Sequence, residues 1–285
     1  MLWLEIMLGL LLAVSAAGIL LLIKKRNSYK PAFYSLALLG VFSCSLLLFG
    51  FRNPDHAFSD EKHLLFVQSF SHADEDTEPI RIKEQILIDA PVVPQLPELP
   101  RGCEVTSLAM LLGSAGVEVD KMVLAEQVKR DPAPRIIKDG VIHFGNPHKG
   151  FVGSMYTFDE PGLGVYHEPI MELAQQYLPG KMVNLSGQSF DELKIPLSES
   201  RPVWVIINAE YRELDESYFQ TWHTSDGPVK VTMKEHSVLI TGYDREYIYF
   251  NDPLTGQKNK KAPISDFEKS WVQMGSQALT YQLDQ

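Results

Sequence analysis

Residues 99–112 read LPRGCEVTSLAMLL and place one of the chain's two cysteines at the start of a helical pattern. Val105, Leu108 and Leu112 recur at helical spacing, which predicts a helix that begins near Cys103. The positive end of a helix dipole favours a thiolate, and nucleophilic cysteines use that environment. Free cysteines are also commonly buried as small apolar residues. Position alone therefore leaves both interpretations of Cys103 open.

The segments around this helix predict an extended approach and two further helices. Residues 86–102, ILIDAPVVPQLPELPRG, contain four prolines, which exclude a helix and enforce an extended path. The patterns VDKMVLAEQVKR, with Asp120 as its cap, and HEPIMELAQQYLP predict amphipathic helices. Residues 131–166 are rich in Gly, Pro and Asn without a clear period, so we expect a long irregular loop or cleft segment there.

The C-terminal part carries strand patterns. Residues 201–209 read RPVWVIINA, an apolar run with β-branched residues that predicts a buried strand. HSVLITGYD and EYIYFNDP follow, and they predict a hairpin whose turn centres on Asp244 and Arg245. Helical patterns come first and antiparallel strands second, which predicts an α+β fold with N-terminal helices and a C-terminal antiparallel sheet.

The N-terminus is apolar enough to span a membrane. Residues 2–23 hold a single charged residue, Glu5, and residues 32–51 form a second apolar run. Each run is long enough to cross a bilayer. The loop between them carries four basic residues: Lys24, Lys25, Arg26 and Lys30. Because positively charged short loops stay in the cytoplasm, both ends of this hairpin are expected to face outward.

The sequence thus predicts three parts. Residues 1–51 form a transmembrane helical hairpin with membrane lipid as its partner, with spans at about 2–23 and 32–51. Residues 52–85 form an acidic linker, and residues 86–285 form a globular domain outside the cell membrane.

Two other interpretations of the apolar runs fit the sequence less well. A cleaved signal peptide has positive charge before its apolar stretch, whereas here the charge follows it. A lipoprotein signal ending at Cys44 conflicts with SLLLFGF, which continues the apolar run beyond that cysteine.

Charge and cysteine content narrow the function classes. The formal net charge is −10, with +3 on residues 1–51 and −13 on the remainder. A domain this acidic is a poor partner for nucleic acid, and we expect none. Cys44 lies in a predicted span and Cys103 beyond the membrane, so we expect no disulfide between them. A lone exported thiol is unusual because free thiols oxidise outside the cell.

Three other polar residues can complete a thiol-based site. His236 opens the strand HSVLITGYD, from which an imidazole can reach a helix N-terminus and act as a general base. Asp252 ends the next strand, and hairpin pairing brings it near His236, where it can orient the ring. Gln95 precedes Cys103 by eight residues, and its amide can donate to an oxyanion. Taken singly, each residue also has an ordinary structural explanation. His236 fits a strand-end histidine, Asp252 part of an Asn-Asp-Pro turn, and Gln95 an exposed loop glutamine.

Together these residues follow the chain order of papain-like enzymes. The motifs VPQLPELPRGCEVTSLAMLLGSAG, NPHKGFVG, GVYHEP, EHSVLITGYD and YFNDPLTG resemble the C39-like branch of the cysteine peptidases, which is related to the bacteriocin-processing double-glycine peptidases. The resemblance covers about residues 86–283. It implies a papain-like fold with Cys103 as nucleophile, His236 as base and acid, Asp252 as orienting residue and Gln95 at the oxyanion hole.

The chain departs from the bacteriocin processors in two ways. It has no Walker motif, and Glu104 follows the cysteine where those processors tend to have glycine. A double-glycine leader is therefore not supported as substrate. The spacing of His143, His148 and His167 fits no usual metal-ligand pattern, and the expected chemistry requires no metal or cofactor.

The resulting prediction is a membrane-anchored, outward-facing cysteine hydrolase. It would act on peptide or cell-surface amide bonds through a thioester intermediate. A transpeptidase or acyltransferase uses the same thioester and differs only in the acceptor. A papain-like binding or scaffolding module without turnover also stays open.

Overall fold

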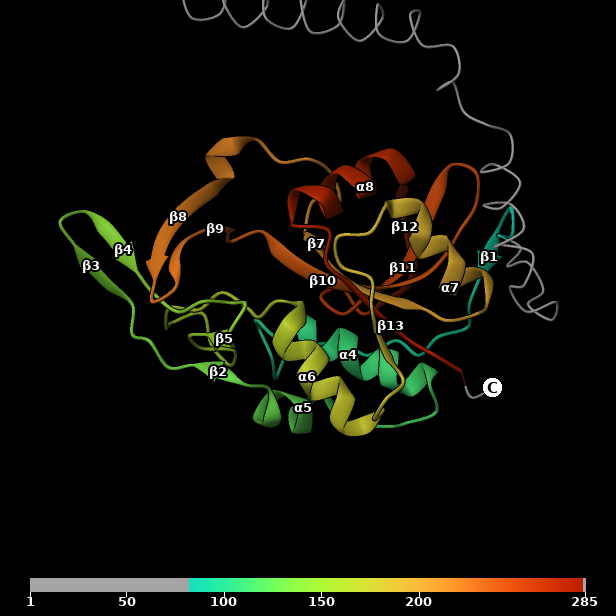
Figure 1. Cartoon of the computed structure of the whole chain (residues 1–285), viewed down its shortest axis with the longest axis horizontal. Helices are drawn as coiled ribbons and strands as arrows, with labels where there is room; N and C mark the ends of the chain where they lie inside the picture. Colours follow the sequence, from blue (N-terminus) through green and yellow to red (C-terminus); the bar gives the residue numbers. More distant parts are fainter. Residues whose placement is uncertain (1–81, 284–285) are drawn as a thin grey trace, which may run out of the picture. The chain divides into compact units, whose positions relative to one another are not determined.

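The computed structural model describes residues 82–283 (Figure 1). Its helices are α4 (Cys103–Ser114), α5 (Lys121–Gln127), α6 (His167–Tyr177), α7 (Lys194–Ser198) and α8 (Ile264–Gln273), with 3-10 helices η2 (Phe190–Leu193) and η3 (Glu216–Tyr218). Its strands are β1 (Ile86–Leu87), β2 (Arg130–Asp131), β3 (Ile136–Lys138), β4 (Val141–His143), β5 (Phe151–Val152), β6 (Met182–Asn184), β7 (Val203–Asn208), β8 (Phe219–Thr224), β9 (Gly227–Thr232), β10 (Glu235–Tyr243), β11 (Tyr247–Asp252), β12 (Gln257–Pro263) and β13 (Ala278–Tyr281). This order confirms the predicted α+β class.

A seven-stranded antiparallel sheet forms the centre of the domain. Its order is β12-β11-β10-β7-β13-β6, and β1 pairs with β10 in addition. The predicted hairpin is confirmed, since β10 and β11 pair with Leu239 opposite Asn251. On its other side β10 pairs with β7, with His236 opposite Ile207. β10 is therefore a central strand with neighbours on both edges, which fixes the position of the histidine at its start.

Helices cover both faces of this sheet, as Figure 1 shows. Alternate residues of β7 point to opposite faces, as the two-residue period of a strand requires. Trp204 and Ile206 join the cluster that includes α4 and α6, whereas Val205 joins the cluster that includes α7 and α8. The buried strand predicted from RPVWVIINA is thus apolar throughout because both of its faces are covered.

The helix α4 begins at Cys103 for a local steric reason. Gly102 caps it, and a Cβ at that position would lie 2.6 Å from the Cβ of Leu99. The hydroxyl of Thr106 donates to the carbonyl of Gly102 at 2.7 Å. Among residues 82–283, no acceptor is found for the backbone N–H of Cys103, as expected for the first turn of a helix. The cysteine therefore stands at a helix end with free donors.

Residues 131–166 differ from the predicted irregular loop. They contain the β3–β4 hairpin, which continues into a four-stranded sheet of order β3-β4-β8-β9. The join between β4 and β8 is a single parallel pair, His143 with His223. Strands of two or three residues carry no measurable period. The Asp139-Gly140 turn between β3 and β4 was the available sequence signal, and it was overlooked.

Two predicted helices are confirmed, whereas the predicted membrane spans were not tested. The carboxylate of Asp120 caps α5 by accepting from the N–H of Met122 at 2.7 Å, and α6 matches HEPIMELAQQYLP. Within residues 82–283, no helix is long and apolar enough to cross a membrane. The predicted hairpin at 1–51 and the linker up to residue 81 lie outside the described residues, and both stay predictions.

Candidate active site

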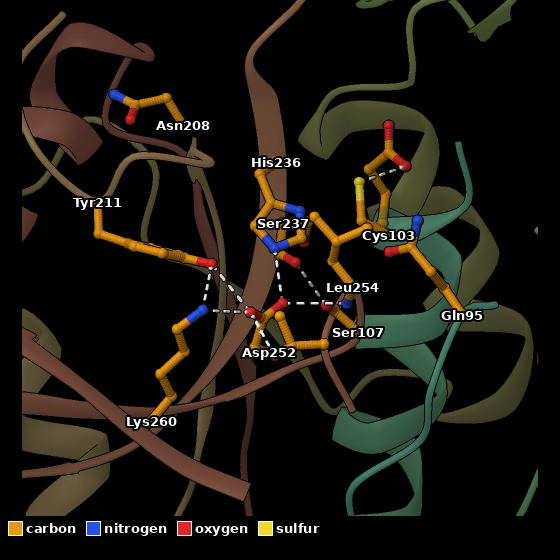
Figure 2. Close-up of polar contacts among 12 residues, drawn as sticks. Gln95, Cys103, Ser107, Asn208, Tyr211, His236, Ser237, Asp252, Leu254 and Lys260 are labelled. Atoms are coloured by element: carbon orange, nitrogen blue, oxygen red, sulfur yellow. Dashed lines mark hydrogen bonds and ion pairs between the residues drawn. The ribbon is translucent and has the colours of Figure 1, made fainter. Parts of the chain in front are cut away.

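The first turn of α4 holds Cys103 against the central strand β10. The hydroxyl of Ser107, one turn along the helix, donates to the carbonyl of Ser237 at 3.1 Å. The indole N–H of Trp204 donates to the carbonyl of Glu104 at 3.0 Å. Cys103 is a free cysteine, 6% exposed. These contacts fix the thiol beside the start of β10 (Figure 2).

His236 and Asp252 form the predicted pair. Nε2 of His236 lies 2.9 Å from Oδ1 of Asp252, and both side chains are buried. The ladder pairs Leu239 with Asn251, so Asp252 reaches His236 diagonally rather than from the directly opposite position. The Asn251 side chain points elsewhere, donating to the carbonyls of Ala90 and Pro91. The alternation of the strand thus selects the aspartate as the partner of the histidine.

This hydrogen bond sets the tautomer of the imidazole. An ionised carboxylate only accepts, so the neutral ring of His236 carries its proton on Nε2. Nδ1 then presents a lone pair, and Figure 2 shows this nitrogen turned toward Cys103. The arrangement is the one a general base requires, with one nitrogen held and the other facing the nucleophile.

A second set of donors holds the other oxygen of Asp252. Oδ2 accepts from the hydroxyls of Tyr211 at 2.9 Å and Thr255 at 2.8 Å, and from Nζ of Lys260 at 2.9 Å. Burial alone would raise the pKa of Asp252. The hydrogen bond from His236, the charge that this ring carries when protonated, and the bonds from Lys260 and Thr255 hold that pKa well below its usual range. Asp252 is therefore ionised at neutral pH.

Gln95 lies beside Cys103, although its amide is already engaged. Its Nε2 donates to the carbonyls of Leu99 at 3.2 Å and Pro100 at 3.1 Å, while Oε1 is buried without a hydrogen-bond partner. The side chain is only 2% exposed rather than an ordinary loop glutamine. As it stands, the amide offers no free N–H to an oxyanion, whereas the backbone N–H of Cys103 does.

Two acidic residues surround the thiol. Sγ of Cys103 donates to Oε2 of Glu104 at 3.3 Å, and Glu235 lies nearby at the start of β10. Burial raises the pKa of Glu104 to about 7, and burial together with the Glu104 charge raises the pKa of Glu235 well above its usual value. Burial first, and then these two carboxylates, raise the pKa of the Cys103 thiol well above its ordinary value.

The sequence left open whether Cys103 is activated by the helix N-terminus or buried as a small apolar residue, and the structure buries it. The dipole of α4 is present, but burial and two acidic neighbours outweigh it. In the resting arrangement Sγ of Cys103 donates a hydrogen bond to Glu104, as a neutral thiol does.

Several site residues were missed from the sequence. Tyr211 lies in a loop and Lys260 in β12, and neither element was predicted. Glu235 was not singled out as a site residue, although it directly precedes His236. The Thr-Gly pair at 255–256 lies in the turn between β11 and β12, and it was the available signal for a strand carrying Lys260. No sequence signal indicated Tyr211, because only the tertiary fold brings it to Asp252.

Comparison with known proteins identifies the family. Residues 87–279 match the family model described as "Peptidase_C39 like family". The chain belongs to this family. The protein YvpB of Bacillus subtilis (strain 168), described as uncharacterized, is 47% identical over 186 residues, which are 65% of this chain and 71% of that protein. The resemblance stated from the motifs is thereby confirmed.

A solved structure supports the same family assignment. A Bacillus anthracis protein whose crystal structure is described as that of a proposed C39-like peptidase has 48% sequence identity and a TM-score of 0.66. The match covers 71% of this chain and 99% of that chain. The C39-like peptidase fold, with helices packed on an antiparallel sheet, is therefore established for this domain.

Proposed function

We propose that this protein is a cysteine peptidase, or another amide hydrolase, that uses Cys103, His236 and Asp252. The observation that carries the proposal is the 2.9 Å hydrogen bond between His236 and Asp252 beside a cysteine at a helix N-terminus. Membership of the C39-like family supports the same reaction class. The three residue types and their roles match those of thiol-dependent acyl transfer.

The reaction would begin from the neutral thiol. His236 takes the proton of Cys103 on Nδ1 as Sγ attacks the carbonyl carbon of the amide, and Asp252 stabilises the imidazolium. His236 then gives that proton to the leaving amine as the C–N bond breaks, which leaves a thioester on Cys103. Water, deprotonated by His236, attacks the thioester and releases the acid and the free thiol.

The oxyanion would be held by two N–H groups. The backbone N–H of Cys103 is available in the first turn of α4. Gln95 becomes the second donor if its amide turns from the carbonyls of Leu99 and Pro100 when substrate binds. The unpartnered Oε1 of Gln95 favours such a turn, since the resting orientation leaves one buried polar atom unsatisfied.

A test of the proposal compares the full-length protein with its Cys103→Ala variant on a mixture of unmodified peptides. New N-termini, identified by mass spectrometry, are expected with the wild type and absent with the variant. Adding an excess of a primary amine separates hydrolysis from acyl transfer, because a transferase joins the amine to the acyl group released by Cys103. Identical peptide and amide products from both proteins would contradict the proposal.

A binding module without turnover is the second candidate, and two observations favour it. The raised pKa of Cys103 and the engaged amide of Gln95 describe a site at rest rather than one poised for attack. This candidate predicts no cleavage by the wild type and unchanged ligand binding by Cys103→Ala.

We also propose that residues 1–51 anchor the domain in the cell membrane, with residues 86–285 outside. The support is the pair of apolar runs at about 2–23 and 32–51 and the four basic residues between them. Protease added to intact cells is expected to remove the domain. Full protection of the domain in intact cells, with cleavage after lysis, would contradict this orientation.

A further inference from the structure

A thiol and two carboxylates converge on one point at the base of the site. Sγ of Cys103 and one oxygen each from Glu104 and Glu235 all lie within 4.8 Å of one another. Cys103 and Glu104 open α4, and Glu235 opens β10, so the packing of that helix on that strand creates the cluster. The proposed peptidase chemistry uses the thiol but neither carboxylate.

One of these carboxylates has an unfilled acceptor aimed into the protein. Oε1 of Glu235 is enclosed and has no hydrogen-bond partner among the described residues. Oε1 of Glu104, by contrast, is fixed by the N–H of Val165 at 2.7 Å, which leaves its Oε2 for the thiol. A backbone donor that orients a carboxylate in this way is typical of the surroundings of a metal ligand. An unsatisfied buried oxygen requires a partner, and within residues 82–283 the protein supplies none.

The backbone leaves room for both carboxylates. A Cβ at Gly164 would lie 2.1 Å from Oε1 of Glu104 and 2.7 Å from Oε2 of Glu235. Any other residue at position 164 would push the two acids apart. No Lys or Arg in the described part of the chain forms an ion pair with either of them. Two carboxylates held this close repel one another when both are ionised, and a divalent ion would offset their charge.

The ligand set selects the kind of ion. A thiolate with two carboxylates suits a borderline divalent ion such as Zn²⁺ and not Mg²⁺ or Ca²⁺, which take oxygen ligands only. In a tetrahedral zinc site a sulfur and an oxygen ligand are about 3.5 Å apart, given Zn–S and Zn–O bonds of about 2.3 and 2.0 Å. The observed distance between Sγ of Cys103 and Oε2 of Glu104 is 3.3 Å. The two atoms are already at ligand spacing.

We propose that Cys103, Glu104 and Glu235 form a binding site for a zinc-class divalent ion, which occupies the nucleophilic sulfur and blocks attack. The fourth position of the ion faces solvent or substrate, as in a three-ligand zinc site. Ion binding is independent of the proposed peptidase activity, whereas its inhibitory consequence rests on it. The site goes beyond the expectation from the sequence, which foresaw no metal.

The test uses Co²⁺ as a spectroscopic probe in the full-length protein on a Cys44→Ser background, so that Cys103 is the single thiol. Co²⁺ is expected to give a thiolate-to-cobalt band in the near ultraviolet that added Zn²⁺ removes. Cys103→Ser is expected to abolish the band. Glu235→Gln is expected to weaken Co²⁺ affinity by about 10- to 100-fold. Glu168→Gln is the matched control, because Glu168 is a half-buried acid that forms an ion pair with His148 instead. The Co²⁺ affinity of this variant is expected to equal that of the parent protein.

Three results would overturn the proposal. The first is the absence of a thiolate-to-cobalt band, and the second is a Co²⁺ affinity that is unchanged in Glu235→Gln. The third is a Co²⁺ affinity that is lost in His236→Ala but kept in Glu235→Gln, which would indicate a thiol–imidazole site instead. Far-ultraviolet circular dichroism checks the folding of each variant, and Glu104→Gln replaces Glu235→Gln if the latter fails to fold. A protein that binds Co²⁺ through Cys103 but cleaves no peptide after chelation would contradict the proposed function and leave the ion site intact.

Discussion

At the residue scale, the site is organised around Asp252 rather than around the thiol. One oxygen of this carboxylate holds His236, and the other accepts three hydrogen bonds, from Tyr211, Lys260 and Thr255. Hydrogen bonds to an ionised group are the strong ones, and a network of them fixes the imidazole in one orientation. The chemistry of Cys103 therefore depends on an aspartate that never touches it.

Replacing Asp252 with Ala tests this dependence. We expect the rate of Cys103 alkylation by iodoacetamide at neutral pH to fall by about 100-fold, because the imidazole loses its orientation and tautomer. Stability should fall by about 1–3 kcal/mol, since buried donors lose their acceptor. Mass spectrometry of the Cys103 peptide measures the first effect and urea unfolding the second. Asp252→Asn, which keeps one acceptor oxygen, should be intermediate; wild-type alkylation in Asp252→Ala would contradict the assignment.

Lys260 is a positioning residue whose effect is expected in the pH profile. Its hydrogen bond helps to lower the pKa of Asp252, so in Lys260→Met that pKa should rise toward the value that burial favours. Because protonated Asp252 no longer holds His236 in place, the acid side of the alkylation profile should shift to higher pH. Lys258→Met is the control, since Lys258 lies on the same strand but pairs with the exposed Asp89. Equal shifts in both variants would argue against a specific role.

Much of the site could be predicted from individual residues, and the remainder could not. Cys103 precedes a clear helical pattern, and His236 and Asp252 lie on two clear strands, so periodicity and chain order sufficed to nominate them. Glu235 has the same strand signal as His236, but only the packing of α4 on β10 reveals that it faces the thiol. The neutral state of the thiol was also hidden, because burial cannot be read from a helix-start pattern.

At the scale of elements, α4 is positioned by the glycine that precedes it. Gly102→Ala would bring a Cβ to within 2.6 Å of the Cβ of Leu99, so the start of the helix must shift. We expect a loss of about 1–3 kcal/mol in stability together with slower alkylation of Cys103. Thermal unfolding and the alkylation assay measure the two.

Gly113→Ala provides the control in the same helix. Its Cβ would lie 3.1 Å from Cγ of Pro91, a contact that a small adjustment relieves, and alanine is the better helix former by about 1 kcal/mol. Stability should therefore be nearly unchanged or slightly higher. Equal destabilisation by both substitutions would show that the clash at Gly102 is not what matters.

Helices and strands long enough to show a periodic pattern of apolar residues were predicted, and shorter ones were not. α4, α6, β7 and β10 each carry a run of residues with a clear pattern, and each lies where the sequence placed it. The β3–β4 hairpin and the β2–β5 pair consist of strands of two or three residues, and in the β2–β5 pair the two strands are also remote in sequence. The Asp139-Gly140 turn, whose two residues have positive φ angles, was an available sequence signal for the β3–β4 hairpin, whereas β2 and β5 have no local signal of their pairing.

At the scale of the whole molecule, we expect the peptidase-like part to fold on its own. Residues 79–285 form one compact unit, and the Bacillus anthracis structure is covered over 99% of its length by the match to this chain. We expect a fragment of residues 79–285 to unfold cooperatively, with the same Tm as the domain in the full-length protein. Differential scanning calorimetry of both proteins measures this. A fragment without a cooperative transition would show that the first 78 residues are needed for folding.

The central claim is that His236 activates Cys103, and the most direct test is the alkylation of Cys103 from pH 5 to pH 10. The rate constants for iodoacetamide are measured by mass spectrometry of the Cys103 peptide in the wild type and in His236→Ala. The account predicts that the wild type reacts at least about tenfold faster than the variant at neutral pH. The gap between the two rates should narrow as the pH rises, because hydroxide in solution then competes with the imidazole for the thiol proton. Superimposable profiles would mean that the imidazole does not act on the thiol, and would contradict the claim.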